Sequence, residues 1–203
     1  LWPFCKGPLP DLTGLFCGWN GTTGIITRLS LKLFPKRRML DVVGYAVDDL
    51  ELVPELLYQI TQTDMVDNLF VVGFASATHE SHKYVTASIT GDLVEEIEYK
   101  KAVLKKIAAG YEEGRVRFDY PVWDPLKSRF VEKPPYVTPA LAADFERGGG
   151  FRYCGAILPV DMIPEAWRKG MDIAHRLGIN FSAGIQILGY CHSAMFGFVY
   201  PFN

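Results

Sequence analysis

Three glycines spaced three residues apart, followed at once by a strand pattern, constrain this chain more than any other feature. Gly18, Gly21 and Gly24 precede the run from Ile25 to Phe34, in which apolar and polar residues alternate. Glycine lets the backbone approach a ligand closely and direct N–H groups at it. The spacing therefore indicates either a loop that holds a ligand or a structural turn in front of a strand.

The residues around these glycines carry a second signal. The chain reads GLFCGWNGTTGIIT between residues 14 and 27, after an acidic residue at Asp11. This segment resembles the end of the FAD-binding domain in the vanillyl-alcohol-oxidase and p-cresol-methylhydroxylase family, whose FAD domain is shared by flavin-linked D-lactate dehydrogenases and glycolate oxidases. Asn20 and Thr23 depart from the family pattern, which usually has an acidic residue and Leu there. The resemblance implies FAD as the cofactor, lined by Gly21, Thr22, Gly24, Ile25 and Ile26.

The composition is that of an ordinary globular chain, with 49% apolar and 22% charged residues among 203. A formal net charge of −2 argues against a nucleic-acid partner. The basic cluster Lys36-Arg37-Arg38 is read as a solvated strand end or, alternatively, as a binding patch. No apolar run is long enough to predict a transmembrane segment, and we expect a cytoplasmic protein or one peripheral to a membrane.

Hydrophobic periodicity predicts the elements that follow Arg38. Strands are expected at residues 39–47, 68–76, 83–90, 151–160, 179–188 and 191–200. Helices are expected from about residue 52 to Ile60, from about 92 to 109, and from Pro164 to Gly178. Between them, residues 115–150 contain five prolines and scattered aromatic residues. That segment is interpreted as a lid-like insertion or as surface ornament.

This order of elements predicts an α+β fold, with the helices on one face of a mainly antiparallel sheet. The resemblance implies the same architecture, because a ferredoxin-like substrate or cap domain follows the FAD domain in that family. We therefore expect residues 1–38 to end an FAD-binding domain and residues 39–203 to form the cap. Both ends of the chain read as parts of structural elements, so a segment of a larger enzyme is expected.

The resemblance also implies a reaction, in which hydride leaves a carbon that bears a hydroxyl group and FAD accepts it. His192 is the leading candidate for the base that takes the hydroxyl proton, with Tyr190 beside it. Arg152, after the triple glycine 148–150, is a candidate for binding a substrate carboxylate. The alternatives are a half-buried strand histidine and a solvated arginine. If the strand begins before His192, Phe198 and Tyr200 share its face, as a pocket wall or as core.

Two histidines in the stretch His79-Glu80-Ser81-His82 resemble a metal cluster, but their expected turn offers no evident third ligand, so no metal site is predicted. The sequence thus predicts an FAD-dependent oxidoreductase of a 2-hydroxy acid. Alternatives are an aromatic alcohol or phenol oxidase and a non-catalytic α+β ligand-binding module. The partners implied are a small-molecule substrate, an upstream FAD-binding domain of the same polypeptide and an electron acceptor. The nature of the acceptor and the oligomeric state stay open.

Overall fold

The computed structural model describes residues 16, 21–30, 33, 35–76, 79–120, 150–179 and 181–202. The expected insertion therefore falls mostly outside the described residues. The chain divides into two compact units, Leu1–Lys36 and Arg37–Asn203.

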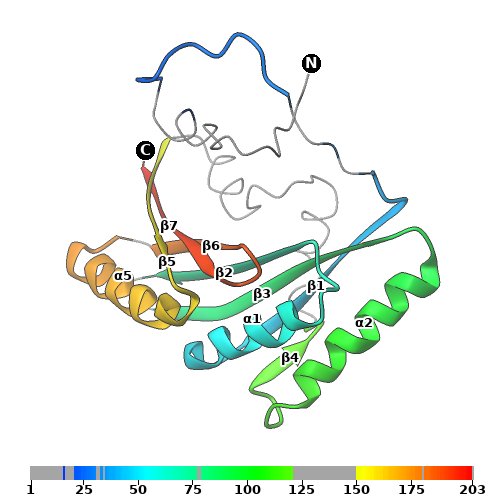
Figure 1. Cartoon of the computed structure of the whole chain (residues 1–203). Coiled ribbons are helices and arrows are strands. Elements are labelled where there is room, and N and C mark those ends of the chain that lie inside the picture. The colour runs from blue at the N-terminus through cyan, green and yellow to red at the C-terminus, as the bar shows by residue number, and fades with distance from the viewer. Residues whose placement is uncertain are drawn as a thin grey trace. The chain divides into compact units, whose positions relative to one another are not determined.

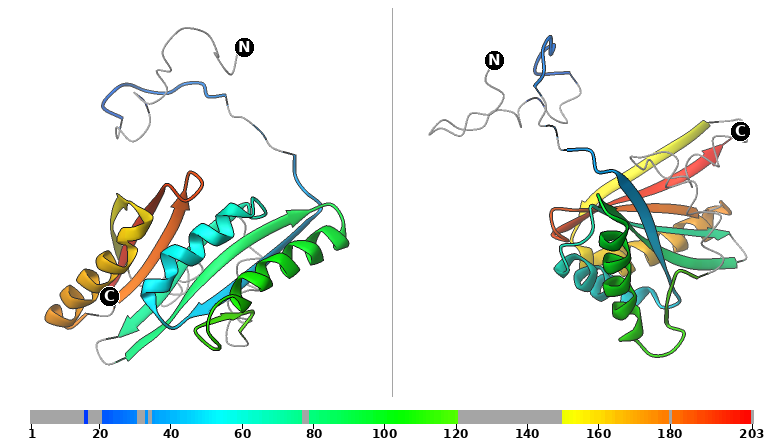
Figure 2. Two further views of the ribbon diagram at one scale, coloured as in Figure 1. Left: turned by 60° about the horizontal axis from the view of Figure 1, so that its bottom comes forward. Right: turned by 90° about the vertical axis from the view of Figure 1, so that its right-hand side faces the viewer.

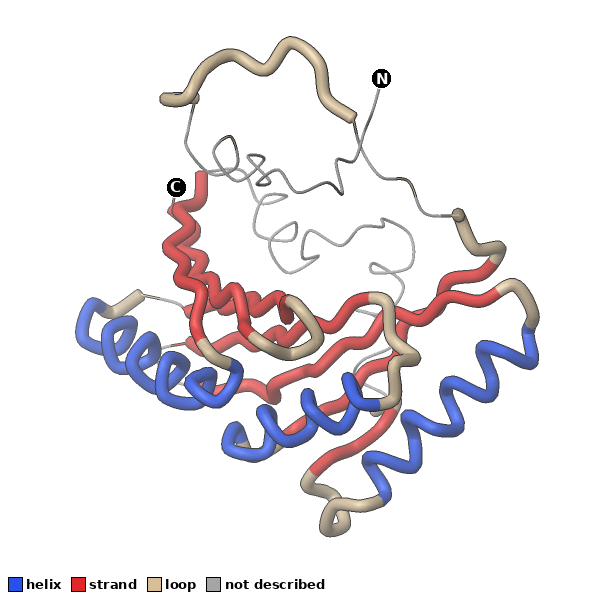
Figure 3. Tube along the Cα trace, viewed as in Figure 1, coloured by secondary structure: helices blue, strands red, loops and turns tan. Residues whose placement is uncertain are grey.

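Seven antiparallel strands form one sheet in the second unit, in the order β4-β1-β3-β2-β6-β7-β5 (Figures 1 and 3). The strands are β1 (Met39–Val47), β2 (Asn68–Ser76), β3 (His79–Gly91), β4 (Val116–Phe118), β5 (Gly150–Leu158), β6 (Phe181–Leu188) and β7 (Ser193–Phe202). The α+β class and the mainly antiparallel sheet predicted from the sequence are confirmed.

Among the described residues, three α-helices lie on one face of this sheet: α1 (Val53–Gln62), α2 (Val94–Ala109) and α5 (Ile163–Leu177), as Figure 2 shows. Short 3-10 turns lead into two of them, η2 (Leu50–Leu52) before α1 and η4 (Val160–Met162) before α5. Both of these helices carry proline in the first turn, where its missing N–H costs nothing. Gly178 ends α5 in the left-handed conformation, with φ of 65°.

The main core lies between the helices and the sheet. Leu56, Leu57 and Ile60 of α1 and Leu104 of α2 are fully buried against strand residues such as Val85. Trp167 of α5 packs directly over β2. A Cβ atom added to Gly73 would lie 2.1 Å from the Trp167 ring carbon Cη2, so the close approach of the indole requires glycine there.

The first half of the sheet completes a ferredoxin-like unit. Its elements follow the order β1-α1-β2-β3-α2-β4, and its strands lie in the order β4-β1-β3-β2. The second half repeats the beginning of that plan as β5-α5-β6-β7. The two halves join where β2 pairs antiparallel with β6, so their strand orders mirror each other across this junction.

A short sequence repeat accompanies the repeated plan. Glu51-Leu52-Val53-Pro54-Glu55 enters α1, and Asp161-Met162-Ile163-Pro164-Glu165 enters α5. The repeat also places equivalent contacts across the junction. Arg168 of α5 pairs with Glu51, and Tyr58 of α1, the equivalent of Arg168, interacts with Asp161, the equivalent of Glu51. The two halves are thus related by a structural repeat.

Several local predictions are wrong in detail. The strand β4 lies inside the segment expected to be irregular. His79 to His82 lie in β3 rather than in a turn. Leu93, which lies within the helix expected from about residue 92, is 62% exposed, because it precedes α2 in an extended conformation. The described residues between Ile25 and Lys36 are assigned no strand, since a strand needs a hydrogen-bonded neighbour.

Candidate functional site

The glycine-rich segment forms a turn in the first unit. The N–H of Gly24 donates to the carbonyl of Gly21 at 3.4 Å, and φ is 78° at Gly21 and 138° at Gly24. These φ values favour glycine strongly. A Cβ atom at either position would meet nothing within 4 Å. Backbone conformation, rather than crowding by neighbours in this chain, therefore accounts for both glycines, and the backbone of the turn is open on that side.

The residues after this turn expose a row of apolar side chains. Ile25 is 93% exposed, and Leu29 and Leu33 are 70% and 85% exposed. Ile26 is 57% exposed. Such exposure of branched aliphatic residues is costly in water. The candidate cofactor residues Gly21, Thr22, Gly24, Ile25 and Ile26 are thus adjacent and accessible in this unit.

His192 and Tyr190 both lie in the turn between β6 and β7. Gly189, Tyr190 and Cys191 have φ of 52°, 53° and 67°, and the N–H of His192 donates to the carbonyls of Leu188 and Gly189, each at 3.1 Å. Left-handed residues other than glycine are strained. The turn holds Cys191 in the core, where burial raises the pKa of its thiol, and leaves Tyr190 84% exposed.

His192 therefore precedes β7, which begins at Ser193, and the expectation that it shares a strand face with Phe198 and Tyr200 is wrong. The left-handed turn interrupts the two-residue periodicity on which that expectation depended. Phe198 packs against Phe196, with ring centroids 4.7 Å apart, on the helix side of the sheet.

The structure does not bring Arg152 to this turn. Arg152 lies in β5 at the position paired with Tyr200, eight residues along β7 from His192. At the rise of an extended strand, that separation is about 26 Å. A carboxylate held at Arg152 is too far away for its neighbouring carbon to meet a base at His192, so the two residues cannot serve one small substrate together.

The opposite face of the sheet, which we name the outer face, is the second candidate surface. It carries a separate apolar cluster of buried residues, Val42, Ala46, Phe70, Val72 and Tyr84. One register row crosses this face on all seven strands, from Arg117 on β4 through Ala46, Tyr84, Val72, Gly184 and Gly197 to Gly155 on β5. Three adjacent strands thus carry glycine at the same level.

This glycine row (Gly184, Gly197 and Gly155) leaves bare backbone between larger side chains. The next row on the same face contains Phe70, Gln186, Met195 and Ile157. The Gln186 amide nitrogen donates to the Asn68 side-chain oxygen and to the carbonyls of Leu69 and Ile187. Sequence reasoning missed this surface, because the three glycines lie in different strands and only the register aligns them.

Polar groups border the other end of the row. The Arg117 guanidinium stacks over the Tyr120 ring at 4.2 Å and pairs with Asp48 at 2.7 Å. Burial, and then the neighbouring Tyr120, raise the pKa of Tyr84, while Arg117 acts in the opposite direction. In the part of the chain that is described, no group of three His, Cys, Asp or Glu side chains is placed to hold a metal ion.

Solved structures share this fold. No family model and no curated protein matches the chain by sequence. The structure is similar to 4-ethylphenol oxidase from Gulosibacter chungangensis in its isoeugenol complex, with a TM-score of 0.67 and 14% identity over 99% of this chain and 46% of the oxidase. It is also similar to alkyldihydroxyacetonephosphate synthase, with a TM-score of 0.52 and 7% identity over 81% of this chain and 37% of the synthase.

The chain thus spans less than half the length of either protein. No helix among the described residues is long and apolar enough to cross a membrane. The fold comparison leads to FAD-linked oxidases, the same family to which the glycine-rich segment points by sequence. The resemblance stated from the sequence is therefore confirmed at the level of fold: the chain shares its fold with solved structures of FAD-linked oxidases.

Proposed function

We propose that this chain supplies the last cofactor-contacting segment and the substrate-binding cap of an FAD-dependent oxidase that acts on a phenol or an aromatic alcohol. The observation that carries the proposal is the similarity to 4-ethylphenol oxidase over 99% of the chain. That similarity extends over the glycine-rich segment as well as the cap. Because it covers 46% of the oxidase, the activity is proposed for the complete polypeptide, with an FAD-binding domain upstream.

The 2-hydroxy acid expected from the sequence is not supported by the comparisons. The distance between Arg152 and His192 also argues against it, because a carboxylate clamp and a base must lie on either side of one carbon atom. The phenolic alternative needs no carboxylate clamp. Arg152 as a substrate ligand, and His192 and Tyr190 as base and partner, remain predictions of the sequence.

The residues of the glycine-rich turn fit a role beside FAD. Gly21 and Gly24 adopt conformations that favour glycine, and their open Cβ side permits a cofactor to approach the backbone. Thr22 would offer a hydroxyl group and backbone N–H, and Ile25 and Ile26 would offer apolar surface. When bound, FAD supplies the acceptor for the hydride.

The outer face is suited to substrate binding. An aromatic ring is flat, and the glycine row provides a strip of backbone without side chains on which a flat group can lie closely. The buried cluster of Phe70, Val72 and Tyr84 continues the same face beside the glycine row, and the Gln186 amide adds a polar group. We propose this face as the substrate surface, where the chain orients the phenol.

A visible absorption spectrum of the complete protein tests the cofactor and the substrate together. We expect flavin bands that bleach on anaerobic addition of 4-ethylphenol and not on addition of D-lactate or glycolate. Bleaching by D-lactate instead would support a 2-hydroxy acid as the substrate. A colourless protein that FAD cannot reconstitute would support the alternative of a non-catalytic ligand-binding module.

A substitution in the glycine row tests the substrate surface separately. Gly155→Val should raise KM for the phenol about tenfold or more, because the branched side chain occupies the bare strip, and should leave the flavin spectrum unchanged. Ala156→Val, one residue along the exposed part of β5 and on the opposite face, is the matched control. An equal KM for both variants would place the substrate elsewhere.

A further inference from the structure

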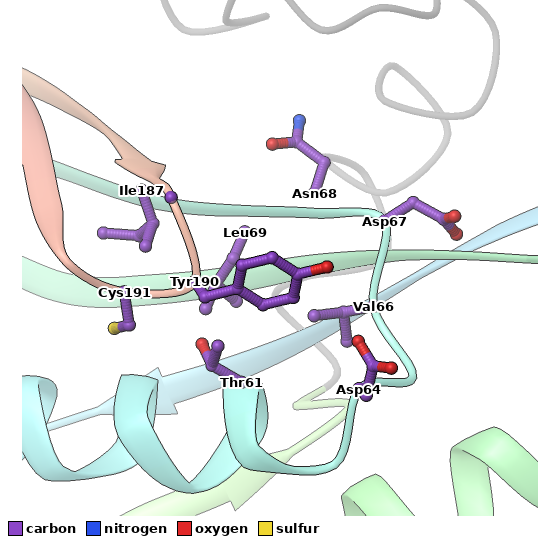
Figure 4. A pocket seen from close by; sticks show the side chains of 10 residues that line it. Thr61, Asp64, Val66, Asp67, Asn68, Leu69, Ile187, Tyr190 and Cys191 are labelled. Atoms are coloured by element: carbon purple, nitrogen blue, oxygen red, sulfur yellow. The ribbon is translucent and has the colours of Figure 1, made fainter. Parts of the chain in front are cut away.

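A pocket of about 310 Å³ lies where α1 ends, β2 begins and the β6–β7 turn approaches them. Its lining includes Val66, Leu69 and Ile187, three apolar residues. In Figure 4 the Tyr190 ring extends across this pocket, with its hydroxyl directed toward the Val66–Asp67 side. The pocket therefore combines apolar walls with an exposed aromatic ring.

Negative charge gathers on the side of α1. Asp64 and Asp67 both line the pocket, and the last turn of α1 contains no basic residue. In contrast, α2 has Lys106 in its last turn, and α5 has His175 and Arg176. Since the C-terminal end of a helix carries partial negative charge, this end of α1 favours a cation that its own sequence does not supply.

Within the described part of the chain, no salt bridge involves Asp64 or Asp67; Asp67 accepts a hydrogen bond from the Thr90 hydroxyl at 2.9 Å. The charge of Asp67 also acts on Arg37, but that guanidinium is already paired with Asp92 at 2.6 Å. The pocket thus retains negative potential.

The residues that line the pocket suit an organic cation better than a metal ion. A bound metal ion needs several oxygen or nitrogen ligands, and no group of three candidate ligands is found among the described residues. An alkyl chain ending in an ammonium or guanidinium group fits better, because its stem packs on apolar walls while its charge meets carboxylates and an aromatic face.

We propose that this pocket binds an alkylammonium or alkylguanidinium group, either as a lysine or arginine side chain of a protein segment or as a free amine. The proposal is independent of FAD and of the outer face. Asp64 and Asp67 provide the charge, Val66, Leu69 and Ile187 contact the stem, and Tyr190 covers the cation.

The test is an NMR titration of the complete protein with Nα-acetyl-lysine methylamide and with agmatine, using Nα-acetyl-norleucine methylamide as the uncharged control. Both cations should shift resonances of Val66, Ile187 and Tyr190 with a Kd of about 1 mM or below, weaker at high salt. If a lysine-containing peptide binds much more tightly than agmatine, the ligand is a side chain of a protein segment. If agmatine binds as tightly as the peptide, the ligand is a free amine.

Variants locate the site. The double substitution Asp64→Asn and Asp67→Asn should weaken binding at least tenfold, and Tyr190→Phe should bind normally while Tyr190→Ala binds less well. Glu55→Gln, at the other end of α1, is the matched control and should change little. Equal binding of the norleucine compound, or unchanged binding by the double variant, would overturn the proposal.

Discussion

The two halves of the sheet begin with the same order of elements and differ in how far helices cover their strands. In the first half, β1 to β4, both α1 and α2 pack on the sheet, and Val43, Tyr45 and Ile89 are fully buried. In the second half, β5 to β7, α5 contacts β6 and β7, and Ile185 and Phe196 are fully buried. Cys154 and Ala156 of β5 are exposed. Among the described elements, α5 thus covers β6 and β7 and leaves this part of β5 exposed.

Trp167 is where the second half depends most on the first, since its indole lies over Gly73 of β2. Trp167→Ala removes a fully buried ring that joins α5 to both halves, and should lower the free energy of unfolding by about 3–5 kcal/mol in urea denaturation.

A double-mutant cycle sharpens that prediction. Gly73→Ala alone should cost about 1–3 kcal/mol, because its Cβ atom meets the ring. In the Trp167→Ala background the same change should cost little, since the obstacle is gone. Additive losses would show that the indole is not what requires glycine.

Alkaline pH should destabilise the first half more than the second, which is the next largest expected effect. The described tyrosines whose pKa is raised, chiefly by burial, all lie in the first half: Tyr45, Tyr58, Tyr84 and Tyr111. A phenol with a higher pKa in the folded state keeps its proton longer than in the unfolded chain. The stability it contributes is complete below about pH 10 and is lost as the pH rises from there toward the folded-state pKa.

Tyr45 should dominate this loss, because it is fully buried and its hydroxyl donates to the Leu104 carbonyl at 3.0 Å. Urea unfolding between pH 9 and 11 should therefore show a shallower decline in Tyr45→Phe than in the unsubstituted protein. Tyr99→Phe, at a 62% exposed position of α2, is the control and should keep the original slope.

The ends of the helices offer a smaller contrast. Gly178 ends α5 with φ of 65°, whereas Gly110 ends α2 with φ of −78°. Gly178→Ala should therefore cost about 1–2 kcal/mol, because alanine is strained in the left-handed region. Gly110→Ala should change the unfolding free energy by less than about 0.5 kcal/mol. Equal losses in thermal unfolding would contradict this assignment.

The smallest expected effect concerns the equivalent contacts across the junction. Glu51 and Arg168 are each 58% exposed, so Arg168→Ala should cost about 0.2–1 kcal/mol, and less at high salt. The equivalent contact between Tyr58 and Asp161 involves a neutral phenol, and the effect of Tyr58→Phe should not depend on salt. A salt-dependent effect of Tyr58→Phe would argue against the equivalence of the two contacts.

Local patterns predicted most of the elements. β1 and β2 begin and end where the sequence indicated, because runs of β-branched and aromatic residues between polar stretches favour strands. The stripe of Val53, Leu56, Leu57 and Ile60 is buried as a 3.6-residue period requires. The short strand β4 escaped prediction, since three residues carry little periodicity and form a strand only by pairing with β1.

The sequence by itself determined that this chain forms an α+β fold and that its glycine-rich segment resembles one that contacts FAD, because both properties depend on residues close together in the chain. Only the tertiary structure decided that Gly184, Gly197 and Gly155 share one row and that Arg152 lies far from His192. Strand register depends on pairing between segments far apart in the chain, where a shift of one residue exchanges the two faces of a sheet.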